Sequence, residues 1–109
     1  MKIEQKKVTA AGIRFFIEQD GREVARAYLY IMKNDQRPEP FGFMEDVWVD
    51  ESCRGQGLAT KILGELIEAA RKNRCYKIVG TSRYGRENVH RLYEKIGFKN
   101  FGVEFKMYL

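Results

Sequence analysis

The chain has 109 residues, of which 44% are apolar and 32% charged, which is typical of one globular domain with a single core. No apolar run approaches the roughly 20 residues of a membrane span, and the first residues lack the apolar stretch of a signal peptide. We therefore expect a single domain over residues 1–109, in the cytoplasm and not in a membrane. The net charge of +5 fits a polyanionic ligand.

The first part of the chain predicts three strands. Residues 13–17 and 24–31 are rich in β-branched and aromatic side chains, and the Asp20-Gly21 pair between them is a strong hairpin signal. A loop over residues 34–40 contains both prolines of the chain. Residues 41–49 then read as the third strand.

From Leu58 the apolar residues recur at helical spacing, and Asn73 is expected just after the end of this helix. Residues 76–81 read as a short strand. Because two strands then flank one helix, we expect them to pair in parallel through a right-handed crossover.

A second helix is predicted over residues 86–96, and Gly97-Phe98 resembles a left-handed cap followed by its hydrophobic contact. Residues 102–109 are expected to form a final strand. The predicted fold class is α+β: a mixed, mostly antiparallel sheet with a βαβ unit and a C-terminal helix–strand.

A glycine-rich turn joins the third strand to the first helix, with the sequence Arg54-Gly55-Gln56-Gly57-Leu58-Ala59. Such a turn at a helix N-terminus directs several backbone N–H groups, and the positive end of the helix dipole, at one anion. No Gly-Lys-Ser/Thr follows, and the third glycine of the dinucleotide fingerprint is missing. A phosphate-bearing cofactor is the favoured ligand, and an ordinary glycine-rich turn is the alternative.

The other reactive side chains predict no metal site. Cys53 and Cys75 lack a metal-binding spacing, and the single histidine, His90, is distant from both in sequence. We expect both cysteines to be free thiols. Nucleic acid is also disfavoured as a partner, because the aromatic residues fall in apolar strand patterns and do not alternate with arginines.

Three segments in this order resemble the GNAT superfamily of acetyl-CoA-dependent N-acetyltransferases. They are Glu45-Asp46-Val47-Trp48-Val49, the turn from Arg54 to Ala59, and Leu92-Tyr93-Glu94-Lys95-Ile96-Gly97-Phe98. The resemblance covers residues 41–109. Local details are also similar to glucosamine-6-phosphate N-acetyltransferases, although Thr81-Ser82-Arg83 stands where those enzymes carry acidic residues.

The resemblance implies that acetyl-CoA is the acetyl donor, and the residues themselves predict no metal. The backbone N–H groups of residues 55–60 would hold its diphosphate, with Arg54 adding a charge, and a bulged third strand would pair with its pantetheine arm. Asn88 would contact the pantetheine amides, or simply be solvated. The residues implied in cofactor binding are Val47, Trp48, Val49, Arg54, Gly55, Gln56, Gly57, Leu58, Ala59, Thr60 and Asn88.

Acetyl transfer needs a general acid and a route for the amine proton. By resemblance, Tyr93 is the acid that protonates the CoA thiolate, although its helical spacing also fits a core tyrosine. An alkylamine acceptor is mostly ammonium at neutral pH, so Glu45 or Asp46 is expected to remove its proton. Adjacent strand residues point to opposite faces, so only one of them can serve, and Glu45 is preferred. The alternative is that both are surface charges.

The N-terminal part predicts only strands, whereas the superfamily usually has a helix pair between its first strands. The acceptor site is therefore expected to be unusually open or completed by a second subunit. The alternating apolar residues Val103, Phe105, Met107 and Leu109 favour a homodimer. The favoured function is transfer of acetyl to a primary amine, either a small molecule or a peptide, by direct attack in a ternary complex. The alternative is a non-catalytic acyl-CoA-binding or regulatory module.

Overall fold

The structure is a computed structural model that describes residues 1–109. The chain divides into two compact units, Met1–Val79 and Gly80–Leu109. The first unit begins with a long antiparallel hairpin of β1 (Ala10–Gln19) and β2 (Arg22–Met32). Asp20 and Gly21 form its turn with φ values of 52° and 77°. Positive φ at both positions matches the right-handed twist of the two strands, which explains the Asp-Gly pair.

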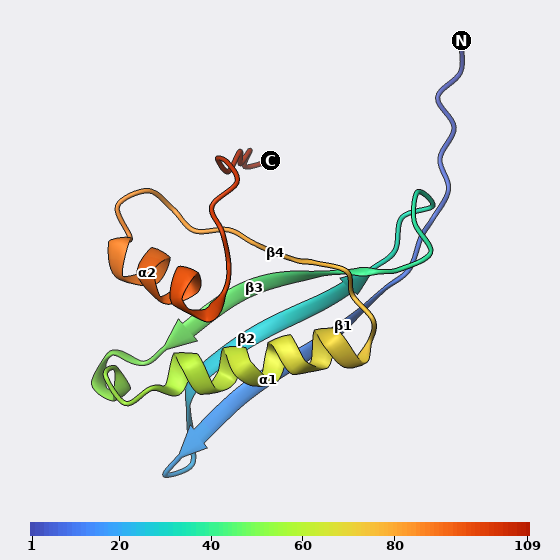
Figure 1. Cartoon of the computed structure of the whole chain (residues 1–109). Coiled ribbons are helices and arrows are strands. Elements are labelled where there is room, and N and C mark those ends of the chain that lie inside the picture. The colour runs from blue at the N-terminus through green and yellow to red at the C-terminus, as the bar shows by residue number, and fades with distance from the viewer. The chain divides into compact units, whose positions relative to one another are not determined.

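The sheet continues with β3 (Phe41–Val49), which pairs antiparallel with β2. A short 3-10 turn, η1 (Glu51–Cys53), and the helix α1 (Leu58–Lys72) follow. The chain then returns beside β3 as β4 (Ile78–Gly80), so the sheet order is β1-β2-β3-β4. Figure 1 shows α1 connecting β3 to β4 as a crossover, which makes these two strands parallel.

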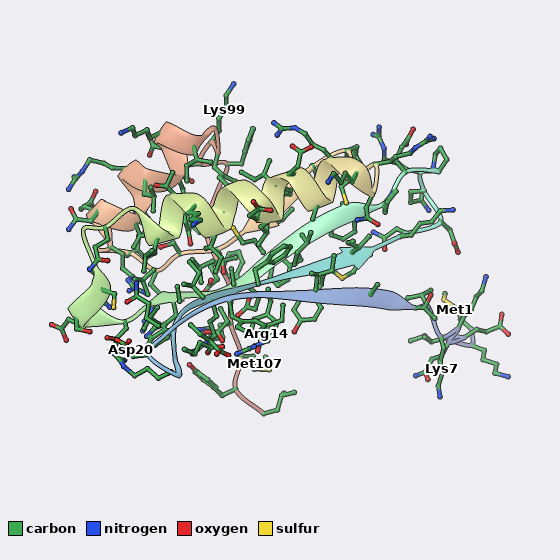
Figure 2. All side chains as sticks on the ribbon, turned by 90° about the horizontal axis from the view of Figure 1, so that it is seen from below. Met1, Lys7, Arg14, Asp20, Lys99 and Met107 are labelled. Carbon is green, nitrogen blue, oxygen red and sulfur yellow. The ribbon has the colours of Figure 1, made fainter.

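The core of the first unit lies between α1 and one face of the sheet, because both present apolar side chains there. Figure 2 shows α1 on one face and Arg14 on the other. The helix contributes four buried residues at helical spacing, and the strands contribute alternate residues. These buried residues are Ala25, Ala27, Leu29, Met44, Ile62, Leu63, Leu66 and Ala70.

The second unit contains one helix, α2 (Glu87–Ile96), which ends at Gly97 with φ 128°. The Phe98 N–H donates to the Tyr93 carbonyl at 2.9 Å, and the two rings lie 5.7 Å apart. The expected cap and its hydrophobic contact are therefore confirmed. Neither α1 nor α2 has the length and apolar character of a helix that could cross a membrane.

The α+β fold and its mixed sheet are confirmed, but the predicted final strand is wrong. Residues 99–109 have no regular structure, and Phe101, Phe105 and Met107 are each more than 80% exposed. Alternating apolar residues alone do not form a strand, because a strand needs a neighbour for its backbone groups.

The length of β4 also needs correction, whereas Asn73 does follow the end of α1. β4 has three residues instead of six. Asn73 caps α1 with φ −88° and donates its side-chain amide to the Ala69 carbonyl at 2.8 Å. The left-handed residue after α1 is Arg74, with φ 61°. The end of the helix is therefore satisfied both by the side chain of Asn73 and by the left-handed turn at Arg74, after which the Cys75 N–H donates to the Ala70 carbonyl at 3.0 Å.

Candidate functional site

The third strand is bulged at the residues that the sequence singled out. Arg26 of β2 lies opposite Trp48, and Tyr28 lies opposite Glu45. Two residues of β3, Asp46 and Val47, therefore stand opposite one residue of β2. Asp46 has φ 48°, in the left-handed region that glycine usually occupies at such a bulge.

The Asp46 carboxylate pairs with a residue that the sequence did not indicate. The Arg26 Nε donates to Asp46 Oδ2 at 2.8 Å, and its Nη2 donates to Oδ1 at 3.3 Å. This hydrogen bonding to Asp46 raises the pKa of Arg26 above its ordinary value. The guanidinium also lies 4.7 Å from the centroid of the Trp48 ring.

The bulge overturns the expectation that Glu45 and Asp46 point to opposite faces. Glu45 is the cross-strand partner of Tyr28, and Tyr28 lies two residues from Arg26 on the same face of β2. Asp46 turns its carboxylate to that face as well, because its left-handed backbone interrupts the strict alternation of the strand. The two carboxylates differ in their partners: both oxygens of Asp46 accept from Arg26.

The outer edge of β3 is only partly paired by β4. The Gly42 N–H donates to the Lys77 carbonyl at 2.9 Å, which places the start of β4 beside the start of β3. Since β4 has three residues and β3 has nine, β4 is too short to pair with β3 beyond the bulge. The last residues of β3 can therefore offer edge backbone groups to an extended ligand.

The turn from Arg54 to Gly57 leads into α1 without a side-chain cap. Gly55 and Gly57 have φ values of 83° and 76°, and Gly57 is the N-cap residue. No side chain hydrogen-bonds to this helix end, and its first turn contains no acidic residue. The first intrahelical bond runs from the Lys61 N–H to the Gly57 carbonyl, so the preceding N–H groups have no partner within the helix.

Side chains connect the end of β3 to this turn. The Arg54 Nε donates to the Val49 carbonyl at 3.2 Å. Asp50 accepts from the Ser52 hydroxyl and from Arg22 Nη2 at 3.4 Å, and its N–H donates to the Val24 carbonyl at 2.8 Å. The strand end and the helix N-terminus are thus positioned together, and this arrangement can bind an anion at the helix and an extended chain along β3.

The remaining expected site residues lie on α2, in the second unit. Tyr93 is half-buried and contacts the Phe98 ring. Asn88 is exposed, and its Oδ1 accepts from Arg91. The half-buried His90 ring nitrogen Nε2 lies 3.1 Å from the Ser82 Oγ and 3.0 Å from the Arg83 carbonyl. The His90 ring therefore contacts the loop before α2.

The cysteines and carboxylates form no second reactive centre. Cys53 is buried and Cys75 is half-buried, and both are free thiols. Burial raises the pKa of the Cys75 thiol, which disfavours the thiolate that a nucleophile requires. No group of three or more His, Cys, Asp or Glu side chains comes together.

Comparisons with known proteins identify relatives of this chain. A family model described as the acetyltransferase (GNAT) family matches residues 3–98. A glucosamine 6-phosphate N-acetyltransferase of Trypanosoma brucei brucei is 37% identical over 86 residues, which are 78% of this chain and 56% of that protein. Glucosamine 6-phosphate N-acetyltransferase 1 of Oryza sativa subsp. japonica is 33% identical over 84 residues, 77% of this chain and 49% of that protein.

A solved structure is similar in fold. The crystal structure of glucosamine-6-phosphate N-acetyltransferase from Arabidopsis thaliana has a TM-score of 0.82 and 29% identity, covering 89% of this chain and 66% of that one. The chain spans about half the length of the curated relatives that it matches.

Proposed function

Because the chain belongs to the GNAT acetyltransferase family, we propose that it transfers an acetyl group from acetyl-CoA to a primary amine. The observation that carries this proposal is the uncapped, glycine-rich N-terminus of α1, which directly follows a bulged strand. The diphosphate of acetyl-CoA would bind the N–H groups at residues 55–60, and the pantetheine arm would pair with Val47, Trp48 and Val49. Asn88 would hydrogen-bond the pantetheine amides.

The reaction proceeds by direct attack in a ternary complex. The amine nitrogen attacks the thioester carbonyl carbon, the new C–N bond forms, and the C–S bond breaks. Glu45 removes the amine proton, directly or through water, and Tyr93 gives its phenolic proton to the CoA thiolate. Glu45 is proposed in preference to Asp46 because both oxygens of Asp46 already accept hydrogen bonds from Arg26.

The acceptor is proposed to be a small molecule with a primary amine. Relatives named glucosamine 6-phosphate N-acetyltransferases support an amino sugar phosphate as the first compound to test. A screen would mix acetyl-CoA with glucosamine 6-phosphate, a polyamine, an aminoglycoside, lysine and a peptide, and measure free CoA thiol. Tight acetyl-CoA binding without CoA release for every amine would favour a non-catalytic acyl-CoA-binding module.

Replacing Tyr93 with phenylalanine tests the proposed acid. We expect Tyr93→Phe to lower kcat by about 10²- to 10⁴-fold while the affinity for acetyl-CoA changes little, because only the proton donor is lost. The matched control is Tyr84→Phe, since Tyr84 is 83% exposed in the loop before α2. Equal kcat values for the wild type and both variants would exclude Tyr93 as the acid.

We also propose that the protein acts in the cytoplasm as a homodimer. The exposed apolar side chains of residues 101–109 support association, because monomeric proteins rarely expose a long apolar stretch. Light scattering at several protein concentrations measures the mass of the protein in solution. The mass of two chains is expected, and the mass of one chain would contradict the dimer.

A further inference from the structure

We propose that Arg26 is a positioning residue for the acetyl-CoA arm. Its two-pronged pair with Asp46 holds the bulge of β3 in the conformation that presents the backbone of residues 47–49 to the ligand. This inference rests on the proposed function, because it takes acetyl-CoA as that ligand. Arg26 itself is on β2 and acts through Asp46.

The bulge benefits from an external restraint because Asp46 is not glycine. A left-handed backbone costs more for aspartate than for glycine, although aspartate tolerates it better than most residues, and Asp46 adopts it with φ 48°. If Asp46 returned to an extended conformation, the pairing with β2 could slip by one residue. A slip of one residue would turn every following side chain and N–H group of β3 to the opposite side.

Arg26 is held rigidly enough to supply this restraint. Two of its nitrogens bind the two oxygens of Asp46, in the fork geometry that fixes both partners. Its Nη1 lies 3.6 Å from Glu23 Oε2, and its guanidinium covers the Trp48 ring. The group is therefore held from three sides, and its position determines where the Asp46 carboxylate can lie.

The restraint acts at the place where β3 loses its pairing with β4. Before the bulge, the Gly42 N–H still bonds to the Lys77 carbonyl. Beyond the bulge, Arg26 and Trp48 are direct cross-strand partners, so the fixed guanidinium also sets the register of the last residues of β3. The backbone that would pair with an extended ligand thus depends on a side chain of the neighbouring strand.

A cycle of variants at residues 26 and 46 tests this proposal by acetyl-CoA affinity, which requires no catalytic base. We expect Arg26→Gln to weaken acetyl-CoA binding by about three- to tenfold when residue 46 is aspartate. The same change should have an effect below about twofold when residue 46 is glycine, because glycine takes a positive φ without help. Isothermal titration calorimetry measures all four affinities.

Further variants distinguish a positioning role of Arg26 from an effect of its charge and from a general effect of substituting an arginine. Arg26→Lys keeps the charge but loses the fork, so it should weaken binding as Arg26→Gln does. Arg37→Gln is the matched control. Arg37 also pairs with a glutamate, Glu39, and covers an aromatic ring, that of Tyr76 at 4.0 Å, but it lies in the loop before β3. It should change the affinity by less than about twofold.

A spectroscopic signal reports the bulge directly, because Trp48 is the only tryptophan of the chain. Its emission should shift in Arg26→Gln and respond less to acetyl-CoA than in the wild type. Circular dichroism checks that each variant is folded. The proposal is overturned if Arg26→Gln leaves the affinity unchanged, or weakens it equally with aspartate and glycine at residue 46. A wild type that does not bind acetyl-CoA would instead overturn the proposed function, and this inference with it.

Discussion

Among single residues, Asp50 gives the first unit a dependence on pH. It accepts hydrogen bonds from Ser52 and Arg22 at the junction between β3 and the turn before α1. The Ser52 hydrogen bond, with the nearby Arg22 charge, lowers the pKa of Asp50 below its ordinary value of 3.8. A carboxyl group with a lowered pKa in the folded state stabilises that state above the unfolded pKa. This contribution is lost as the pH falls through the folded pKa.

We therefore expect Asp50→Asn to lower the free energy of unfolding at pH 7 more than at about pH 3, because pH 3 lies below the ordinary pKa of 3.8 and this contribution is already being lost there. Urea unfolding at the two pH values measures both differences. Ser52→Ala should reduce the pH-dependent part, since the hydrogen bond from Ser52 is the main cause of the shift. The same loss at both pH values would show that Asp50 does not stabilise the fold through its charge.

The sequence singled out residues 45–49 of β3 but did not predict how they are arranged. The Glu45-Asp46-Val47 segment was recognised from its resemblance to a family motif. The partner of Asp46 was missed because Arg26 lies 20 positions earlier in the chain. Their contact follows from the register of β2 and β3, and that register contains a bulge that strict alternation does not predict.

At the scale of elements, Gly42 is the residue on which the pairing of β3 with its neighbours depends. A Cβ atom at Gly42 would lie 2.8 Å from Leu29 Cδ1 and 3.6 Å from Ile78 Cγ1. Leu29 is fully buried, so its side chain would have to shift within the packed core. We expect Gly42→Ala to lower the free energy of unfolding by about 1–3 kcal/mol through overpacking.

A second glycine provides the control for this prediction. Nothing lies within 4 Å of a Cβ added at Gly64 on α1, so Gly64→Ala should raise the free energy of unfolding by about 0.5–1 kcal/mol. Chemical unfolding of both variants gives the two values. If Gly42→Ala proved as stabilising as Gly64→Ala, the result would contradict the close packing around Gly42.

The elements with strong local signals were predicted well, and those that depend on neighbours were not. The Asp20-Gly21 turn, the apolar stripe of α1 and the Gly97 cap are each specified within a few residues. β4 and the segment after Gly97 carry apolar residues, but their extent depends on which backbone groups find a partner. The apolar pattern of either segment does not show which backbone groups will find a partner.

For the whole molecule, charge is the property that bears most directly on the proposed donor. The chain has a net charge of +5, and residues 80–109 hold six Lys or Arg residues against three Glu. Acetyl-CoA carries several phosphate charges, and a basic protein attracts such a ligand through its whole field. Membership of the family was predictable from three spaced segments, whereas no residue pattern specifies the amine.

The affinity for acetyl-CoA should therefore fall as the salt concentration rises from about 0.05 to 0.5 M, because salt screens the attraction. S-acetylpantetheine lacks the phosphates, and its weaker binding should change little over this range. Calorimetric titrations of both compounds make the comparison. A salt-independent affinity for acetyl-CoA would show that neither the net charge nor the phosphates contribute to binding.

The uncapped start of α1 has a thermodynamic consequence. Without a capping side chain at Gly57, the first N–H groups of the helix have no side-chain partner in the free protein, and this end is expected to open more readily than a capped one. A bound diphosphate would take the place of the missing cap, so binding and completion of the helix become one event. Ligand at 100 times its Kd would then stabilise the folded chain by about 2.7 kcal/mol, and a cofactor bound there would be a structural component of the helix.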